Sequence, residues 1–325
     1  MDEKSDLLLE KIIKAFFNRS LTFSLQPEEI ELFTWDKQQA FLNATIQNKA
    51  VVKHPVSSEF CRLFFKKVID FLEPVQEVHD DFYTHLCSVL KNSSVEDYCF
   101  RHYMIGDDYE NLIIMKETKN MVVNGTTGMR TWQAALMLAD WIISNKNQFS
   151  GKNILELGSG VGFTGITIAK TCRIPSLYLT DCHEDVLKAI CDNIEINFPQ
   201  MGRKENGDFT IYSDEHRNIG VMMLDWNSLD DYPYKVVPDV IIGADIIYDP
   251  IILKPLCNVI KTFFSKNKYL EVYIANIIRN EDTYKSFIEM LDFMGLTCEQ
   301  QNQSKGVCIH WDNTIQRCLL KIKLK

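Results

Sequence analysis

The chain has 325 residues, enough for a catalytic domain of about 200 residues plus an extension. With 46% hydrophobic and 24% charged residues and no repeat, the composition excludes a disordered or fibrous protein. The net charge of -9 argues against a large nucleic-acid-binding surface, because neutralising phosphates requires a basic face.

Signals for secretion and for membrane insertion are missing from the sequence. The first residues are acidic and lack the basic start of a signal peptide. The longest apolar run, 236–248, carries Asp239 and Asp245 and is shorter than the roughly 18 residues that span a bilayer. Ten cysteines without paired or zinc-ligand spacing predict reduced thiols and no metal. We therefore expect a cytoplasmic, monomeric protein without membrane or direct nucleic-acid contacts.

Apolar residues recur at helical spacing through residues 1–95, for example at Leu8, Ile12 and Phe16. Pro27, followed by two glutamates, indicates the start of a helix, since proline and acidic residues both suit a first turn. We predict a mainly helical N-terminal region over residues 1–95.

The pattern changes to short alternating runs between Tyr98 and Val123, which predict a hairpin. We expect residues 96–130 to form bridging strands. Thr131–Ile143 is apolar at helical spacing and predicts a core helix at the start of a catalytic domain over residues 131–325.

From residue 153 onward the sequence alternates between strand and helix patterns. We predict strands at 153–157, 177–180, 221–224, 239–244 and 271–275, with helices at 163–171, 184–197, 251–264 and 282–294. Such alternation is typical of an α/β fold with a doubly wound, mostly parallel sheet. The last two strands, 296–300 and 316–323, have no helix between them and are expected to pair antiparallel at one edge.

A glycine-rich loop follows the first of these strands in the segment NILELGSGVGFTG, with Glu156 ahead of Gly158, Ser159 and Gly160. Glycines allow the backbone to approach a ligand closely. The segment also fits the G-x-G-x-x-G dinucleotide pattern. A carboxylate at Glu156 would repel a pyrophosphate but suit the cationic amino group of S-adenosylmethionine. We therefore favour a methyl-donor site over a dinucleotide site or a purely structural turn.

Two further acids follow the next strands. Asp181 could bind both ribose hydroxyls of a nucleotide cofactor, or it could cap the following helix. Asp225 and Trp226 come after the third strand, where an adenine needs an apolar plate and a polar partner at its edge. A core tryptophan beside an exposed aspartate is the alternative.

The fourth strand ends in Ala244 and Asp245, with Tyr248 three residues later. Amine methylation requires a neutral nitrogen aimed at the methyl carbon, whereas lysine, with a pKa of about 10.4, is charged at neutral pH. Asp245 could hold the ammonium, and Tyr248 could line the channel through a cation–π contact. The alternatives are capping of the sheet end by Asp245 and core filling by Tyr248.

Together these segments resemble the seven-β-strand protein-lysine methyltransferases, a Rossmann-like fold, and D-x-x-Y at Asp245–Tyr248 is similar to their hallmark. Within that group, GTTGMRTW at residues 125–132, TDCH at 180–183 and KHP at 53–55 resemble the lysine methyltransferases of eukaryotic elongation factor 2. The resemblance implies elongation factor 2 as the protein substrate and S-adenosylmethionine as the methyl donor, with S-adenosylhomocysteine as product. It also implies cofactor contacts for Trp132 and Ala244, besides the loop, Asp181 and Trp226, and substrate-side roles for Asp245 and Tyr248.

Other interpretations remain open at this point. The fold could methylate another protein or RNA, or it could bind the cofactor without catalysis. The polar segment 200–218 and the loop 302–313 match no pattern, and either could shape substrate entry or be a solvated connection.

Overall fold

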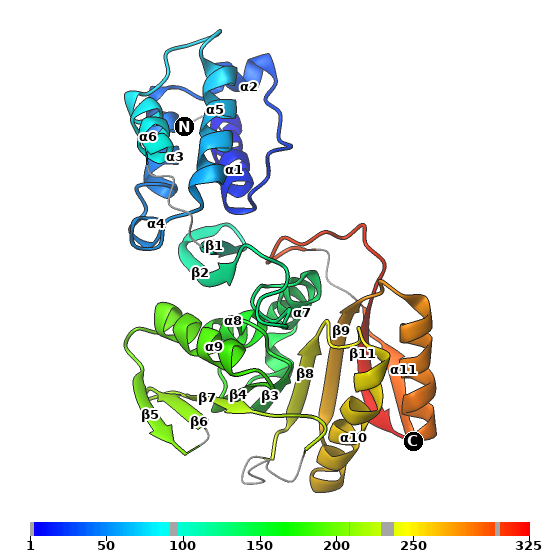
Figure 1. The fold of residues 1–325 in the computed structure, drawn as a ribbon. Coiled ribbons are helices and arrows are strands. Elements are labelled where there is room, and N and C mark those ends of the chain that lie inside the picture. Colours follow the sequence, from blue (N-terminus) through cyan, green and yellow to red (C-terminus); the bar gives the residue numbers. More distant parts are fainter. Residues whose placement is uncertain (1–2, 92–96, 208, 229–236, 303–305) are drawn as a thin grey trace. The chain divides into compact units, whose positions relative to one another are not determined.

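A computed structural model describes residues 3–91, 97–207, 209–228, 237–302 and 306–325 (Figure 1). The chain divides into two compact units, residues 1–119 and 120–325. The strands expected within 96–130 belong to the first unit. Within the described ranges, no helix is both long and apolar enough to cross a membrane.

The first unit consists of helices followed by a two-stranded antiparallel hairpin. Its elements are α1 (Glu3–Phe17), α2 (Pro27–Leu32), α3 (Trp35–Ala44), α4 (Lys49–Lys53), α5 (Ser58–Leu72), α6 (Asp80–Lys91), β1 (Tyr98–Ile105) and β2 (Asp108–Thr118). Pro27 occupies the first turn of α2, as predicted.

Phenylalanine rings form the core of the first unit. Phe16 of α1 contacts Phe41 of α3 and Phe64 of α5, with ring centroids 6.1 and 5.4 Å apart. All three side chains are fully buried, because the helical spacing places them on the inward faces of their helices. A β-bridge between Val56 and Phe100 joins the hairpin to the segment before α5.

The second unit alternates strands and helices, as the sequence predicts. Its elements are α7 (Gln133–Ser144), the short 3-10 helix η1 (Lys146–Gln148), β3 (Asn153–Leu157), α8 (Phe163–Thr171), β4 (Ser176–Asp181), α9 (Glu184–Asn197), β5 (Gly202–Asn206), β6 (Phe209–Ser213), β7 (Asn218–Met223), β8 (Val240–Ala244), α10 (Pro250–Lys266), β9 (Glu271–Ile277), α11 (Glu281–Phe293), β10 (Leu296–Gln300) and β11 (Arg317–Leu324).

These strands form one sheet in the order β10-β11-β9-β8-β3-β4-β7-β6-β5. The central strands β9, β8, β3, β4 and β7 run parallel, whereas β11 pairs antiparallel with both β9 and β10. This arrangement confirms the predicted Rossmann-like sheet with its antiparallel C-terminal hairpin. The carboxyl ends of β3, β4, β7 and β8, which precede the candidate site residues, therefore lie along one edge of the sheet.

Helices cover both faces of this sheet (Figure 1). On one face, α10 and α11 bury a continuous apolar cluster against the strands, including Leu256, Phe263 and Phe287. On the other face lie α7, α8 and α9. Gly165 in α8 is essential to this packing, because a Cβ there would lie 2.2 Å from a methyl carbon of Leu179 on β4.

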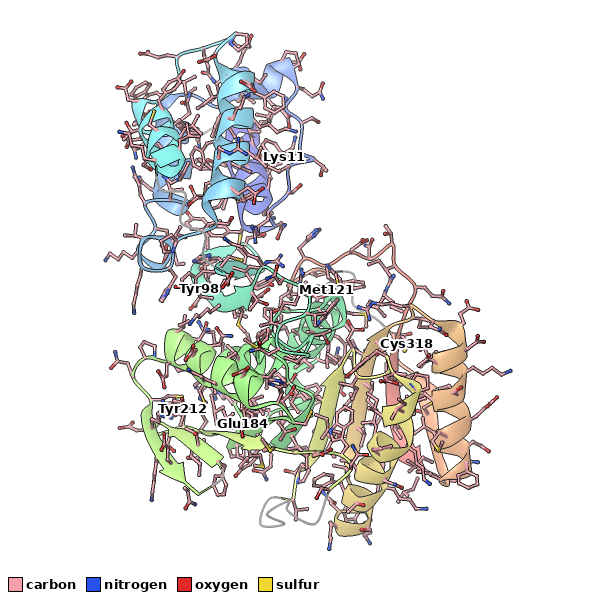
Figure 2. All side chains as sticks on the ribbon, in the orientation of Figure 1. Lys11, Tyr98, Met121, Glu184, Tyr212 and Cys318 are labelled. Atoms are coloured by element: carbon pink, nitrogen blue, oxygen red, sulfur yellow. The ribbon has the colours of Figure 1, made fainter. Side chains whose placement is uncertain are left out.

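The segment 200–218, which matches no pattern in the sequence, contains β5 and β6 and extends the sheet beyond β7. Tyr212 on β6, labelled in Figure 2, is buried and donates a hydrogen bond of 2.9 Å to Glu195 of α9. Every residue of β5 is exposed, so no apolar alternation marks that strand. The available signal was Gly207, which follows the last paired residue of β5 and has a φ of +61°, a conformation that glycine supplies in tight hairpin turns.

The loop 302–313 is attached to α7 by a buried carboxylate; residues 303–305 of it lie outside the described residues. Asp140 accepts hydrogen bonds from the backbone N–H groups of Gly306, Cys308 and Ile309, at 2.7 to 3.0 Å. It also accepts one from the indole of Trp311 at 3.2 Å. The described part of this loop is therefore a built structural element and not a solvated connection.

Candidate active site

A cavity of about 320 Å³ opens at the carboxyl edge of the sheet in the second unit. This volume is within the range of small-molecule sites. The lining residues are Thr126, Thr127, Gly128, Trp132, Gly158, Gly160, Asp181, Cys182, Leu224, Asp225, Trp226, Asn227, Ala244, Asp245, Ile246, Tyr248, Ile252, Pro255 and Arg279. Most of the residues predicted from the sequence are thus brought together in one place.

The glycine loop after β3 forms part of the cavity wall. Gly158 has φ of +60°, and a Cβ there would lie 2.9 Å from Ile246 and 3.4 Å from the ring of Trp226. Gly160 has φ of +53°, and a Cβ there would lie 3.1 Å from the carbonyl oxygen of Gly128. Both positions need glycine for conformation and for space.

Glu156 and Ser159 support the loop and are absent from the cavity lining. The Glu156 side chain is 2% exposed, and its carboxylate accepts a hydrogen bond of 3.1 Å from the backbone N–H of Gly165 in α8. Burial raises the pKa of Glu156 to about 8. Ser159 Oγ accepts a hydrogen bond from the Thr180 N–H at 2.9 Å, which joins the loop to β4. Contact of either residue with the donor stays a prediction.

Asp181 lies at the end of β4 and lines the cavity. Its carboxylate accepts backbone hydrogen bonds from Gly160 at 3.3 Å and from His183 at 3.2 Å. Burial raises the pKa of Asp181, although these N–H groups oppose the effect. His183 itself begins α9 by accepting a hydrogen bond from Asp185, a local polar role and not that of a base.

Asp225 and Trp226 follow β7 and line the same cavity. Asp225 accepts hydrogen bonds from the backbone and side chain of Asn227, at 2.9 and 3.1 Å. The Trp226 ring lies against Gly158, so it forms a flat apolar surface beside the glycine loop.

The loop after β8 carries Ala244, Asp245 and Tyr248, all of which line the cavity. Asp245 has φ of +56°, an uncommon backbone conformation for a residue other than glycine. Its N–H donates to the Ala275 carbonyl at 2.9 Å, and its carboxylate accepts from the Ile277 N–H at 3.0 Å. The neighbouring strand β9 thus holds Asp245 in place from both sides of the residue.

Arg279, just beyond β9, forms a two-pronged ion pair with Asp245, with nitrogen–oxygen distances of 3.0 and 3.2 Å. The Asp245 side chain is 5% exposed and that of Arg279 47%. From the sequence we expect this carboxylate to be available for a substrate ammonium; in the structure it is paired with an internal cation instead.

Asn276 of β9 holds the rest of this loop. Its amide accepts from the Ile247 N–H at 3.0 Å and donates to the carbonyls of Ile247 and Ile277, at 3.2 and 2.9 Å. Tyr248, which follows Ile247 in the loop, is 59% exposed and lines the cavity. Partial burial and the nearby Cys182 and Asp181 raise the pKa of its phenol.

Trp132 lines the cavity at the start of α7. Its indole N–H donates to the Thr127 carbonyl at 3.0 Å, which holds the cavity-lining segment 126–128 in place. The guanidinium carbon of Arg279 lies 5.2 Å from the centre of the Trp132 ring, so the ring also packs against the ion pair with Asp245.

These residues fit the S-adenosylmethionine that the sequence predicts. Trp226 offers a flat surface for a purine, and Asp181 offers a carboxylate for a ribose diol. The conformations and close contacts of Gly158 and Gly160 leave backbone at the cavity wall where side chains would fill it. Among the described residues, no cluster could hold a metal ion.

The family model of the lysine methyltransferases matches residues 107–293, more than half of the chain. The chain belongs to this family. Its curated relatives include the protein-lysine N-methyltransferase EEF2KMT of Homo sapiens, which is 29% identical over 98% of both chains. The protein of the same name in Mus musculus is 32% identical over 88% of this chain and 84% of its own. Protein-lysine N-methyltransferase EFM3 of Saccharomyces cerevisiae is 26% identical over 77% and 74%.

Membership of the lysine methyltransferase family makes the chain an enzyme that acts on protein lysines. The cavity is therefore the candidate site for the methyl donor and the lysine. Two residues that hold the loop after β8 were not predicted from the sequence, Asn276 and Arg279. The one local signal was that both occur at the carboxyl end of a predicted parallel strand, where α/β enzymes place their sites.

Proposed function

We propose that this protein transfers methyl groups from S-adenosylmethionine to a lysine side chain of eukaryotic elongation factor 2, in the cytoplasm. The observation that carries the proposal is the near full-length similarity to the human protein-lysine N-methyltransferase EEF2KMT, whose name refers to that factor. The fit of the cavity to the donor supports the same proposal.

The donor would lie along the sheet edge, with adenine at Trp226, ribose at Asp181 and the amino-acid part near the glycine loop. When bound, it supplies a methyl carbon that an amine nitrogen attacks as the carbon–sulfur bond breaks, with the electron pair staying on sulfur. Asp245 and Tyr248, beyond the loop, would then line the position of the acceptor lysine.

Protein side chains have little covalent work in such a reaction, since displacement at a methyl carbon depends mainly on alignment. Tyr248 is well placed to guide a lysine side chain, because its ring is partly exposed at the cavity. A lysine that enters as an ammonium must release its proton to water before attack.

Mass spectrometry of elongation factor 2 from cells with and without this protein tests the proposal. One lysine should carry methyl groups only when the protein is present, and adding back the wild-type protein should restore them. A variant with Asp245→Ala, added back at the same level, serves as the inactive control. Unchanged methylation of elongation factor 2 in the deficient cells would contradict the proposal. Radiolabel from the donor in RNA or in another protein of the lysate would identify a different substrate.

A further inference from the structure

The charges that line the cavity are unequally distributed. Three carboxylates belong to the lining, those of Asp181, Asp225 and Asp245. Among the described lining residues, the guanidinium of Arg279 is the one group with a permanent positive charge. Donor and acceptor also bring positive charge, a sulfonium and an ammonium, so the partner of each carboxylate affects the chemistry.

A bare carboxylate beside the acceptor would hinder the reaction. An opposite charge within about 4–6 Å stabilises the charged form of a lysine and raises its pKa. Methyl transfer requires the neutral amine, so an unpaired Asp245 would bind the acceptor in its unreactive form. The two-pronged ion pair with Arg279 removes this effect, because the guanidinium cancels the charge of the carboxylate.

We propose that Arg279 is a positioning residue that neutralises Asp245 and so favours the uncharged, nucleophilic form of the acceptor lysine. This inference rests on the proposed lysine methylation. It assigns Asp245 a different task from holding an ammonium: together with Arg279, the carboxylate forms a polar but uncharged wall of the acceptor site.

The setting of Arg279 supports this assignment. Its guanidinium packs against the Trp132 ring, which holds the ion pair at the cavity side. Asp245 is held independently of Arg279, because its carboxylate accepts from the Ile277 N–H and its own N–H donates to the Ala275 carbonyl. Its position therefore does not depend on the ion pair. Arg279 is partly exposed and lines the cavity together with Asp245, so the ion pair borders the space that an entering side chain would occupy.

Other charged or titratable groups surround this position. They include Tyr248 and Asp249 on the loop after β8, Asp181 and Cys182 at the end of β4, and Asp225 after β7. Cys318 on β11 also interacts with Asp245, and Arg130 packs on the Trp132 ring. Asp181 and Asp225 are assigned to the adenosine part of the donor. Arg279 is therefore the group whose removal should change the charge felt by the acceptor most directly.

The test is the pH dependence of single-turnover methyl transfer to elongation factor 2 purified from cells that lack this protein. Wild type, Arg279→Gln and Arg279→Lys are compared from about pH 6.5 to about pH 9.5. In Arg279→Gln, the rising limb of the curve of transfer rate against pH should move to higher pH by about one unit. Transfer should be roughly tenfold slower near neutral pH, and the rate should return to that of wild type at high pH. Arg279→Lys keeps the charge and should move the limb by less than half as much. Arg130→Gln removes a cation from the same tryptophan without touching Asp245 and should match wild type.

Calorimetry with S-adenosylmethionine separates this role from donor binding, and thermal melting verifies that each variant folds. Donor affinity within about threefold of wild type, together with the shifted limb, supports the proposal. Weaker donor binding with an unmoved limb would make Arg279 a cofactor ligand and overturn it. A loss of rate equal at every pH would also overturn it, because a purely structural role predicts that result. If wild type itself fails to methylate elongation factor 2, the proposed function fails instead, and the two failures are thereby distinguished.

Discussion

The loops after β3 and β8 form neighbouring parts of the cavity, and they are built differently. The loop after β3 takes its shape from glycines and from contacts with the helix and strand that directly follow it. The loop after β8 has no glycine between Asp245 and Tyr248, and side chains and backbone of β9 hold it. The first loop is thus a local structure, whereas the second depends on a strand about thirty positions later in the chain.

This difference predicts separate consequences for binding and for transfer. Damage to the loop after β3 or its neighbour Asp181 should weaken donor binding, because these groups surround the expected adenosine and amino-acid positions. Damage to the loop after β8 should slow transfer while leaving donor binding intact. Three experiments test the separation and a fourth tests the protonation of Glu156 under the first loop, in order of decreasing expected effect.

Replacing Asp245 by alanine should lower the rate of transfer by about 100-fold or more, because it leaves Arg279 unpaired and removes the wall of the acceptor site. Donor affinity, measured by calorimetry, should stay within about threefold of wild type. Asp282→Ala, an exposed acid in the first turn of α11, is the matched control and should be fully active. Turnover that persists in Asp245→Ala would show that the acceptor end is assigned wrongly.

Replacing Asp181 by alanine should raise the donor dissociation constant by about 10- to 100-fold, as expected for the loss of charge-assisted hydrogen bonds to the ribose. The rate at saturating donor should change much less. Calorimetry and initial rates at high donor concentration measure the two effects. An unchanged dissociation constant would remove Asp181 from the donor site.

Asn276→Asp keeps the acceptor for the Ile247 N–H but loses both donated hydrogen bonds and places a charge beside two carbonyls. We expect a loss of about 1–3 kcal/mol in the free energy of unfolding and a roughly tenfold slower transfer. Asn193→Asp is the matching variant for the loop after β3, since the Asn193 amide donates a hydrogen bond of 3.0 Å to the Val161 carbonyl in that loop. That variant should weaken donor binding instead. If both variants affected the same parameter, the two loops would not be separable.

Glu156→Gln should flatten the pH dependence of stability. The pKa of Glu156 in the folded protein, about 8, lies above its ordinary value of 4.5, so between these values the folded state retains a proton that the unfolded state has lost. The free energy of unfolding of wild type should therefore fall as pH rises through this window, by at most about 1.4 kcal/mol per pH unit from this group. In the variant, glutamine can still accept the hydrogen bond from the Gly165 N–H but does not titrate, so the free energy of unfolding should fall less with pH than in wild type. Urea unfolding at several pH values measures both slopes.

Glu184→Gln is the control for this comparison, because Glu184 is exposed in the first turn of α9 (Figure 2). This variant should show the same dependence of the free energy of unfolding on pH as wild type. Parallel slopes in wild type and Glu156→Gln would mean that Glu156 titrates near its ordinary pKa and is ionised under the loop at neutral pH.

The sequence predicted the central sheet closely, for identifiable reasons. Strand β3 and helices α8 and α9 begin and end where predicted, because a buried parallel strand is a short apolar run and its helices begin at clear signals. Strand β5 could not be found by alternation, since none of its side chains is buried. Its pairing depends on β6, whose Tyr212 packs against α9.

The candidate site also contains residues that could be predicted from the sequence and residues that could not. Asp181, Trp226 and Asp245 could be predicted, because each lies at or just beyond the carboxyl end of a strand, the end that faces ligands in this fold. The orientation of the Glu156 side chain depends on a hydrogen bond from Gly165, in the helix that follows the glycine loop, and it could not be predicted from the sequence. Nor could the ion pair of Asp245 with Arg279, since nothing in either local sequence indicates that the two meet.

The position of β11 has a consequence for how the enzyme is made. This strand pairs with β9 at the residues that reach the site, with Arg317 opposite Ile277 and Cys318 opposite Asn276. During synthesis, β9 therefore emerges with β8 as its sheet partner and acquires the second one only when β11 follows. Asp245, Asn276 and Arg279 are translated before β11, but the strand that holds Asp245 gains its second neighbour only then. We therefore expect the Asp245 end of the cavity to become rigid only after the last strand has been synthesised.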